Sequence, residues 1–172
     1  SLKNNGTENS RGIISLKDDK LFKDGSEKEQ DQVIYEKLLE AVRNLRKIDG
    51  LVITGIDVTG YGTPIGDAKK NEHDALMRAL SLKEYLYQSG IAANAVLNVQ
   101  WVAEDWETLA KLVQQSEMPL KTAVLDIIRN VEIARGREKE LKNLSEGYPY
   151  EYMRNEMFPR VQRVEYAITY HV

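Results

Sequence analysis

Apolar residues in this chain alternate between two spacings, and that alternation limits the possible folds more than any other sequence feature. Between residues 27 and 46 they recur about every 3.6 residues, as on one face of a helix, and residues 51–59 then form a β-branched run next to glycines. The same pair of patterns returns in residues 68–88, which are helical, and residues 95–101, which resemble a strand. Strands that alternate with long helices usually share one sheet that the helices cover. The sequence therefore predicts an α/β fold, an α+β sandwich in which helices cover a mixed sheet.

Shorter patterns predict the first and the last strand of the sheet. Residues 1–11 are polar, and we expect a linker there, followed by a first strand in the apolar run 12–16. Residues 160–172 alternate, which predicts a closing strand with one face in solvent. We expect that strand to bury Val164, Tyr166, Ile168, Tyr170 and Val172 and to expose Arg163, Glu165, Thr169 and His171.

A long segment with helical spacing separates the third strand from the last one. It covers about residues 104–159, and breaks at Pro119 and near residues 134–136 predict three short helices up to residue 147. The predicted order is β-α-β-α-β, a helical insertion and a final β-strand, in a single domain over residues 12–172. In the second long helix we expect a buried stripe of Leu76, Ala79, Leu80 and Leu86.

Composition excludes several classes of protein. The 172 residues include 24 basic and 27 acidic side chains, a net charge of −3, which does not favour nucleic acid as a partner. No apolar run approaches the roughly 20 residues of a membrane-spanning helix, so we expect the fragment not to span a membrane. The chain has no cysteine and begins at Ser1. We expect it to be part of a longer protein that carries its own targeting segment or anchor.

The sequence contains no pattern typical of a catalytic site. Its two histidines, His73 and His171, are far apart in the sequence, and each is expected to be a surface residue rather than a metal ligand. Phosphate-binding loops, dinucleotide fingerprints and nucleophile elbows are missing. We therefore expect a protein that is not an enzyme and that uses neither a metal nor a cofactor.

One segment resembles a known family. Residues 60–91 resemble the signature of OmpA-like domains, G-[YH]-T-D-x-x-G-x(4)-N, followed on the helix by R-A and [YF]-L. The last strand also contains the family's R-V-E, at residues 163–165. The resemblance covers about residues 12–102 and 160–171, and the insertion is longer than the family's usual connection. The positions that match without a gap are Gly60, Tyr61, Gly66, Asn71, Arg78, Ala79, Tyr85 and Leu86.

The resemblance implies that this fold binds peptidoglycan without a covalent bond. In the family, a loop aspartate and a helix arginine hold the ammonium and carboxylate groups of diaminopimelate in the stem peptide, and a planar arginine suits a carboxylate. The arginine is retained as Arg78 and the asparagine as Asn71, but Thr63 occupies the position of the aspartate. The negative charge would then have to come from Asp67 or Asp57. The predicted ligand residues are Arg78, Asn71, Thr63 and Asp67.

Each of these residues also has an ordinary structural interpretation. Arg78 could form a surface ion pair, Asn71 a turn or cap hydrogen bond, and Thr63 the turn before Pro64. Aromatic residues of the insertion are expected to serve packing. We expect Trp101 and Trp106 to anchor the added helices to the sheet, and the group of Tyr148, Tyr150, Tyr152 and Phe158 to pack the last helix.

Two functions are compatible with these observations. The first is a cell-envelope module that binds peptidoglycan and tethers an outer-membrane or surface protein. The second is an OmpA-like scaffold that has lost this ligand and binds an envelope protein, for example in adhesin or fimbrial assembly. Both place the chain on the periplasmic face of the outer membrane or on the cell surface of a Gram-negative bacterium. The position of Arg78 distinguishes the two functions. It should lie in an open pocket if the chain binds peptidoglycan, and it should be covered or paired if the chain has lost this ligand.

Overall fold

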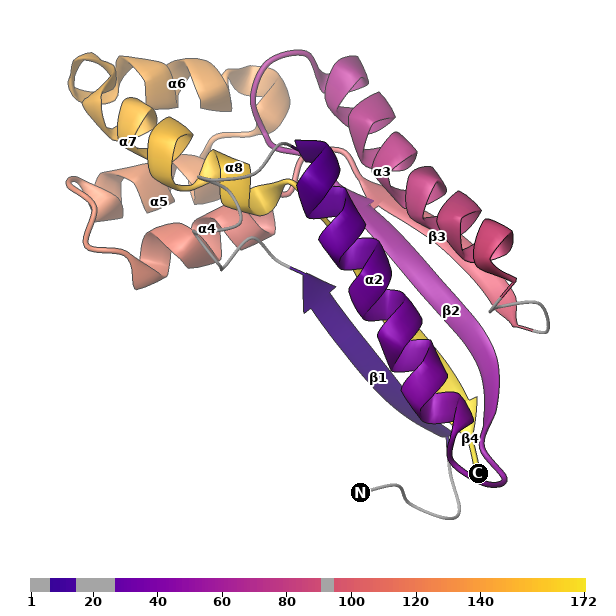
Figure 1. Cartoon of the computed structure of the whole chain (residues 1–172). Helices are drawn as coiled ribbons and strands as arrows, with labels where there is room; N and C mark the ends of the chain where they lie inside the picture. The colour runs from indigo at the N-terminus through magenta and orange to yellow at the C-terminus, as the bar shows by residue number, and fades with distance from the viewer. Residues whose placement is uncertain (1–6, 15–26, 91–94) are drawn as a thin grey trace.

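The fold is a four-stranded mixed sheet with two long helices on one face and a bundle of short helices at one end (Figure 1). The computed structural model describes residues 7–14, 27–90 and 95–172. The strand order is β1-β4-β2-β3; β4 is antiparallel to β1 and to β2, whereas β2 and β3 are parallel. The predicted α/β class is confirmed. The strands are β1 (Thr7–Ile14), β2 (Val52–Tyr61), β3 (Val96–Val102) and β4 (Arg163–His171).

The two long helices have nearly the predicted bounds. They are α2 (Glu27–Arg46) and α3 (Ala68–Ser89), and α3 ends at Gly90, which has a φ of 68°. Glycine adopts this left-handed conformation without the steric cost that a side chain would bring, so it ends helices efficiently. Both helices lie on the same face of the sheet (Figure 1).

The insertion contains more helices than predicted. Residues 106–161 form five α-helices with two short 3-10 turns between them, and the prediction of three helices up to residue 147 matches α4, α5 and α6. The helices are α4 (Trp106–Gln115), α5 (Lys121–Asn130), α6 (Arg137–Asn143), α7 (Tyr148–Glu156) and α8 (Phe158–Val161). No helix in the described ranges is both long and apolar enough to cross a membrane.

The first strand begins earlier than its apolar residues suggested. The prediction of a linker through residue 11 was wrong for residues 7–11, because β1 pairs with β4 from Thr7 onwards, opposite His171. Backbone hydrogen bonds to a neighbouring strand require no apolar side chains, so a polar segment can extend a strand at a sheet edge. Residues 15 and 16 of the predicted strand lie outside the described residues.

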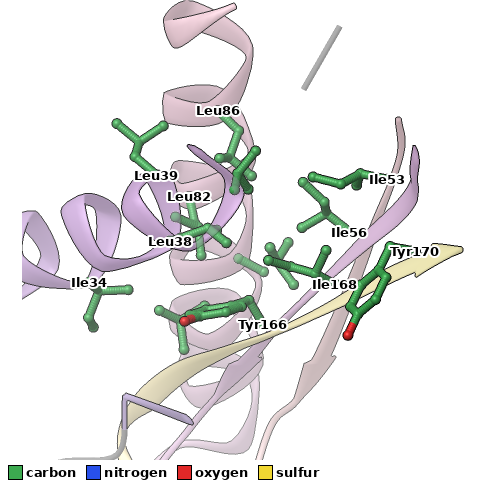
Figure 2. Close-up of a cluster of buried hydrophobic side chains, with 14 residues drawn as sticks. Ile34, Leu38, Leu39, Ile53, Ile56, Leu82, Leu86, Tyr166, Ile168 and Tyr170 are labelled. Atoms are coloured by element: carbon green, nitrogen blue, oxygen red, sulfur yellow. The ribbon is translucent and has the colours of Figure 1, made fainter. Parts of the chain in front are cut away.

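A first hydrophobic core fills the space between the sheet and the two long helices. Figure 2 shows side chains from α2 and α3 meeting side chains from β2 and β4. The predicted face of β4 is confirmed for Val164, Tyr166, Ile168 and Tyr170, which are at most 9% exposed. Val172 lies beyond β4 and is 39% exposed, so its predicted burial was wrong.

Helix α3 buries Ala79 and Leu86 as predicted, but the rest of its buried stripe differs from the prediction. Its buried residues are Asn71, Ala75, Ala79, Leu82 and Leu86, whereas Leu80 is 38% exposed. The cause is the close approach of α3 to β2: a Cβ on Gly60 would lie 1.9 Å from the Ala75 carbonyl oxygen and 3.1 Å from the Ala79 nitrogen. Only small residues permit such an approach, so the alanines take the inner stripe and larger side chains lie beside it.

A second hydrophobic core lies inside the insertion. It is composed of buried side chains from its helices, including Leu109, Val113 and Leu141, which have no exposed surface. Trp106 and Phe158 belong to it. Tyr150 and Tyr152 pack against this core, as expected, with Tyr150 edge-on to Phe158, but Tyr148 is 69% exposed, so its predicted packing was wrong. Trp101 is 43% exposed on β3, so it does not anchor the insertion.

Candidate functional site

The four residues predicted to bind a ligand lie around the connection between β2 and α3. Thr63 and Asn71 are buried, with exposed fractions of 5% and 7%, Arg78 is half-buried and Asp67 is exposed. This connection is at the end of the sheet that meets the insertion (Figure 1). The fold therefore brings the predicted residues to one region, and their contacts decide what they can do there.

Asn71 and Thr63 both face the interior of the protein. The Asn71 side-chain nitrogen donates a hydrogen bond of 2.7 Å to the carbonyl oxygen of Ile65, which closes the turn before α3. The hydroxyl oxygen of Thr63 is buried and has no hydrogen-bond partner. This asparagine thus has the turn role that sequence analysis gave as its ordinary interpretation.

Asp67 caps the first turn of α3. Its carboxylate accepts a hydrogen bond of 3.0 Å from the backbone nitrogen of Lys69. An aspartate at this position satisfies a backbone donor at the helix N-terminus and interacts favourably with the helix dipole. The carboxylate that could have replaced the missing aspartate is therefore already in use within the helix.

Asp57, the other candidate for that charge, is on the opposite side of the sheet from α3. Its neighbours Ile56 and Val58 are buried in the first core, so the alternation of a strand directs Asp57 to the other face. There it accepts a hydrogen bond of 2.7 Å from the side chain of Asn98. The sheet itself separates this carboxylate from Arg78.

Arg78 links three elements of the fold. One guanidinium nitrogen donates to the carbonyl oxygen of Tyr61 at 3.1 Å, and another donates to the Gln162 side-chain oxygen at 3.1 Å. Tyr61 is the last residue of β2, and Gln162 immediately precedes β4. The arginine thus fastens α3 to the end of β2 and to the point where the insertion returns to the sheet.

The insertion also holds the β2–α3 connection directly. The Gly66 backbone nitrogen donates to the Glu138 carboxylate on α6 at 3.2 Å, and Ile65 packs against the core of the insertion. Gly62 donates to the Val102 carbonyl and accepts from the Asp105 backbone nitrogen, at 2.8 and 3.2 Å. We call residues 62–67, together with these partners, the junction.

A buried arginine that the sequence analysis missed lies at the same junction. Arg163 is 7% exposed and forms an ion pair of 2.8 Å with Asp105, which is 5% exposed. It also donates to Glu165 at 3.0 Å, and its guanidinium lies 3.8 Å from the centre of the Tyr61 ring. The prediction that Arg163 faces solvent was wrong, because the start of the insertion covers this end of β4.

No local pattern marks Arg163 as buried. It obeys the strand alternation, and only the long-range contact with Asp105 and Thr108 of the insertion removes it from water. In the sequence, only the R-V-E at residues 163–165 and the acidic Asp105 at the start of the insertion could have indicated a buried ion pair.

The pKa values of two side chains near the junction, Tyr61 and Glu104, are raised. Burial, together with the nearby Glu165 carboxylate, raises the pKa of Tyr61 to about 12, so its phenol stays protonated and donates to Glu165 at 3.0 Å. Burial also raises the pKa of Glu104, and the negative charge of Glu138 raises it further. Burial is the largest cause of both shifts.

None of the three depressions described on the surface is lined by Thr63, Asp67, Asn71 or Arg78, whereas Asp57 and Tyr61 line the smallest one. One of about 710 Å³ lies beside α3 around Tyr85 and Tyr87, one of about 540 Å³ adjoins Tyr148 on the insertion, and one of about 160 Å³ lies over Ala167 on the helix-free face of the sheet. Within residues 7–14, 27–90 and 95–172 there is no group of three or more His, Cys, Asp or Glu side chains able to hold a metal ion.

The comparisons with known proteins give no family for this chain. No protein-family model matches it, and a search of curated proteins found no match.

Proposed function

We propose that this chain is a non-enzymatic module of a bacterial cell envelope, built on an OmpA-like scaffold, that binds another envelope protein and no longer binds the peptidoglycan stem peptide. The observation that carries the proposal is the contact of the β2–α3 connection with the insertion, in which Ile65 packs against the second core. Thr63 is 5% exposed there, and the Gly66 amide is bonded to Glu138. Of the residues that resemble a ligand pocket, Asn71 and Asp67 serve the turn and the start of α3, and Arg78 bonds to Gln162, where the insertion returns to the sheet.

The charges at the junction support the same conclusion. A zwitterionic ligand needs an anion beside a planar cation. Of the two candidate anions, Asp67 caps α3 and Asp57 lies on the far face of the sheet. Arg78 donates to a backbone carbonyl and to Gln162. A stem peptide would have to displace these contacts before it could bind.

The insertion offers the surface for a protein partner. Tyr148 is 69% exposed and borders the depression of about 540 Å³, together with Lys142, Glu151 and Arg154. Tyrosine and arginine are enriched in protein interfaces, where they contribute a large share of the binding energy. This surface is at the end of α6 and the start of α7, in the bundle beyond the end of the sheet (Figure 1).

Titration calorimetry with a diaminopimelate-containing muropeptide tests the loss of the ligand. We expect no saturable heat at millimolar ligand, for the wild-type chain and for a control with the same peptide carrying lysine. Saturable binding that disappears in a folded Arg78→Ala variant would overturn the proposal and establish the peptidoglycan tether.

Photo-crosslinking in cells tests the protein partner. A crosslinking residue in place of Tyr148 should capture one discrete envelope protein, whereas the same residue in place of Tyr87, which is 57% exposed on α3, should not. Equal capture at both positions, or at neither, would contradict a partner site on the insertion.

Peptidoglycan binding remains the second candidate, because one specific observation favours it. Arg78 keeps its matching position and is only half-buried. Under this alternative, Arg78→Ala weakens muropeptide binding by about 1.5–3 kcal/mol, the usual scale for a charge-assisted hydrogen bond.

A further inference from the structure

Strand β3 lies at an edge of the sheet. In the described part of the chain it pairs with β2 and with no other strand. An edge strand presents unpaired backbone donors and acceptors, and proteins usually protect such an edge with charged residues, proline or a bulge. Residues 96–102, VLNVQWV, contain no charge and no proline, and they pair with β2 without a register shift, in a chain with 30% charged residues.

The side chains of this edge are also available for contact. The exposed fractions are 62% for Val96, 43% for Trp101 and 37% for Val102. Such an uncharged edge with large apolar side chains is suited to pairing with another strand. The sequence of β3 indicates which strand that is.

The residue types of β3 are nearly symmetric about Val99. If a second β3 runs antiparallel with Val99 opposite Val99, then Val96 faces Val102, Leu97 faces Trp101, and Asn98 faces Gln100. Each pair joins residues of the same chemical kind. On one face Val99 meets Val99 and Leu97 meets Trp101, and on the other face amide meets amide, flanked by valine with valine. Since no position carries a charge, no like charges oppose each other across the axis.

We propose that two copies of this chain associate through β3, antiparallel about a twofold axis at Val99, so that their sheets become one continuous sheet. A twofold interface uses the same surface from both copies and must be complementary to itself, which the near-symmetric order of residue types in β3 provides. The dimer is independent of the proposed function, because it uses the free edge of β3 and neither the β2–α3 connection nor the helices of the insertion.

Charges placed at positions 98 and 100 test the register of the proposed strand pair. The variant N98K/Q100K places lysine opposite lysine twice across the axis, and the control N98K/Q100E places lysine opposite glutamate twice. Both positions are exposed, and the new side chain at position 98 would lie beside Asp57, which now accepts the Asn98 hydrogen bond. Analytical ultracentrifugation should find a concentration-dependent dimer for the wild type and the control. The dimer dissociation constant of N98K/Q100K should rise roughly tenfold or more, since like charges directly opposite each other destabilise a strand pair.

Engineered cysteines test the axis itself, since the natural chain has none. Opposite residues of an antiparallel pair have Cα atoms about 4.5–5.5 Å apart, within disulfide range. Val99→Cys and the exposed pair V96C/V102C should therefore form an intermolecular disulfide on mild oxidation. Val96→Cys alone should not, because two copies of residue 96 would be about 20 Å apart.

These results decide the proposal together. A dimer that weakens in N98K/Q100K, persists in N98K/Q100E and crosslinks through V96C/V102C but not through V96C supports it. A wild-type chain that stays monomeric at several hundred micromolar, a dimer unaffected by N98K/Q100K, or equal crosslinking through V96C alone would overturn it. V96C/V102C keeps the test decisive even if Val99→Cys, which replaces a partly buried residue, fails to fold.

Discussion

The two hydrophobic cores of this protein differ in how they are built. The first lies between a sheet and two long helices, whereas the second is formed by short helices alone. What joins them is largely polar: the buried pair Arg163–Asp105, the bond from Gly66 to Glu138, and the bonds of Arg78. The insertion is thus attached to the sheet by specific polar contacts at residues that resemble a ligand site.

The largest expected effect comes from breaking the buried ion pair. Arg163→Met leaves Asp105 buried without its partner, and we expect a loss of about 3–5 kcal/mol in the free energy of unfolding, measured by urea denaturation. The matched control is Lys70→Met, whose partner Asp74 is 42% exposed, and which should cost about 1 kcal/mol or less. Equal losses in the two variants would mean that Arg163 does not hold the two cores together.

The next largest loss of stability is expected from disturbing the close contact between α3 and β2 in the first core. Gly60→Ala places a Cβ 1.9 Å from the Ala75 carbonyl oxygen, so β2 and α3 must separate, and we expect a loss of about 3 kcal/mol. Gly55→Ala is the control, since its Cβ would meet only the Val96 carbonyl oxygen, at 3.6 Å. Thermal unfolding of both variants measures the difference. A Gly60→Ala variant as stable as Gly55→Ala would contradict the tight α3–β2 contact.

Thr63 separates the structural from the ligand-binding interpretation. Thr63→Asp places a carboxylate at a position that is only 5% exposed and should lower the free energy of unfolding by about 2–3 kcal/mol. Thr63→Val removes a hydroxyl that has no partner and keeps the shape, so stability should change by less than about 1 kcal/mol. If Thr63→Asp were instead stable and gained affinity for diaminopimelate-containing fragments, the residue would belong to a pocket.

The smallest expected effect is the pH dependence at Glu104. Its pKa is raised in the folded state, by burial first and by Glu138 second. Folding therefore favours the protonated carboxyl, and its contribution to stability is present at low pH and is lost as the pH rises through the folded-state pKa. Glu104→Gln should be more stable than the wild type at pH 7, with a difference that shrinks toward pH 4.

Thermal unfolding across that pH range checks the prediction. The control is Glu107→Gln, in which the replaced side chain is 83% exposed. We expect a change within about 0.5 kcal/mol for this control. A Glu104→Gln difference that did not vary with pH would exclude burial of its charge as the cause.

Sequence patterns predicted the parts of the fold that depend on local periodicity. The bounds of α2 and the buried face of β4 followed from the spacing of apolar residues. The inner stripe of α3 followed only for Ala79 and Leu86. The burial of Ala75 in place of Leu80 is set by the contact between Gly60 and Ala75, which belong to different elements. Periodicity finds an apolar face but not how closely a helix approaches its neighbour.

The sequence predicted which residues of the candidate site lie close together, but not their burial or their hydrogen-bond partners. The resemblance brought Thr63, Asn71 and Arg78 to one place, and the fold does place them around one connection. The partners of Gly66 and Arg78, Glu138 and Gln162, depend on where the insertion packs, and no spacing within residues 60–91 contains that information. Arg163 was misplaced for the same reason, since Asp105 is 58 positions away in the chain.

The central claim is that the β2–α3 connection is a structural junction. The most direct measurement is NMR of the Gly62 and Gly66 amides, which donate to the Val102 carbonyl and to Glu138. The account predicts slow hydrogen exchange at both amides, with shifts and exchange rates unchanged by millimolar diaminopimelate-containing muropeptide. Rapid exchange that becomes slow when the muropeptide is added would contradict it and show that the connection is a ligand loop.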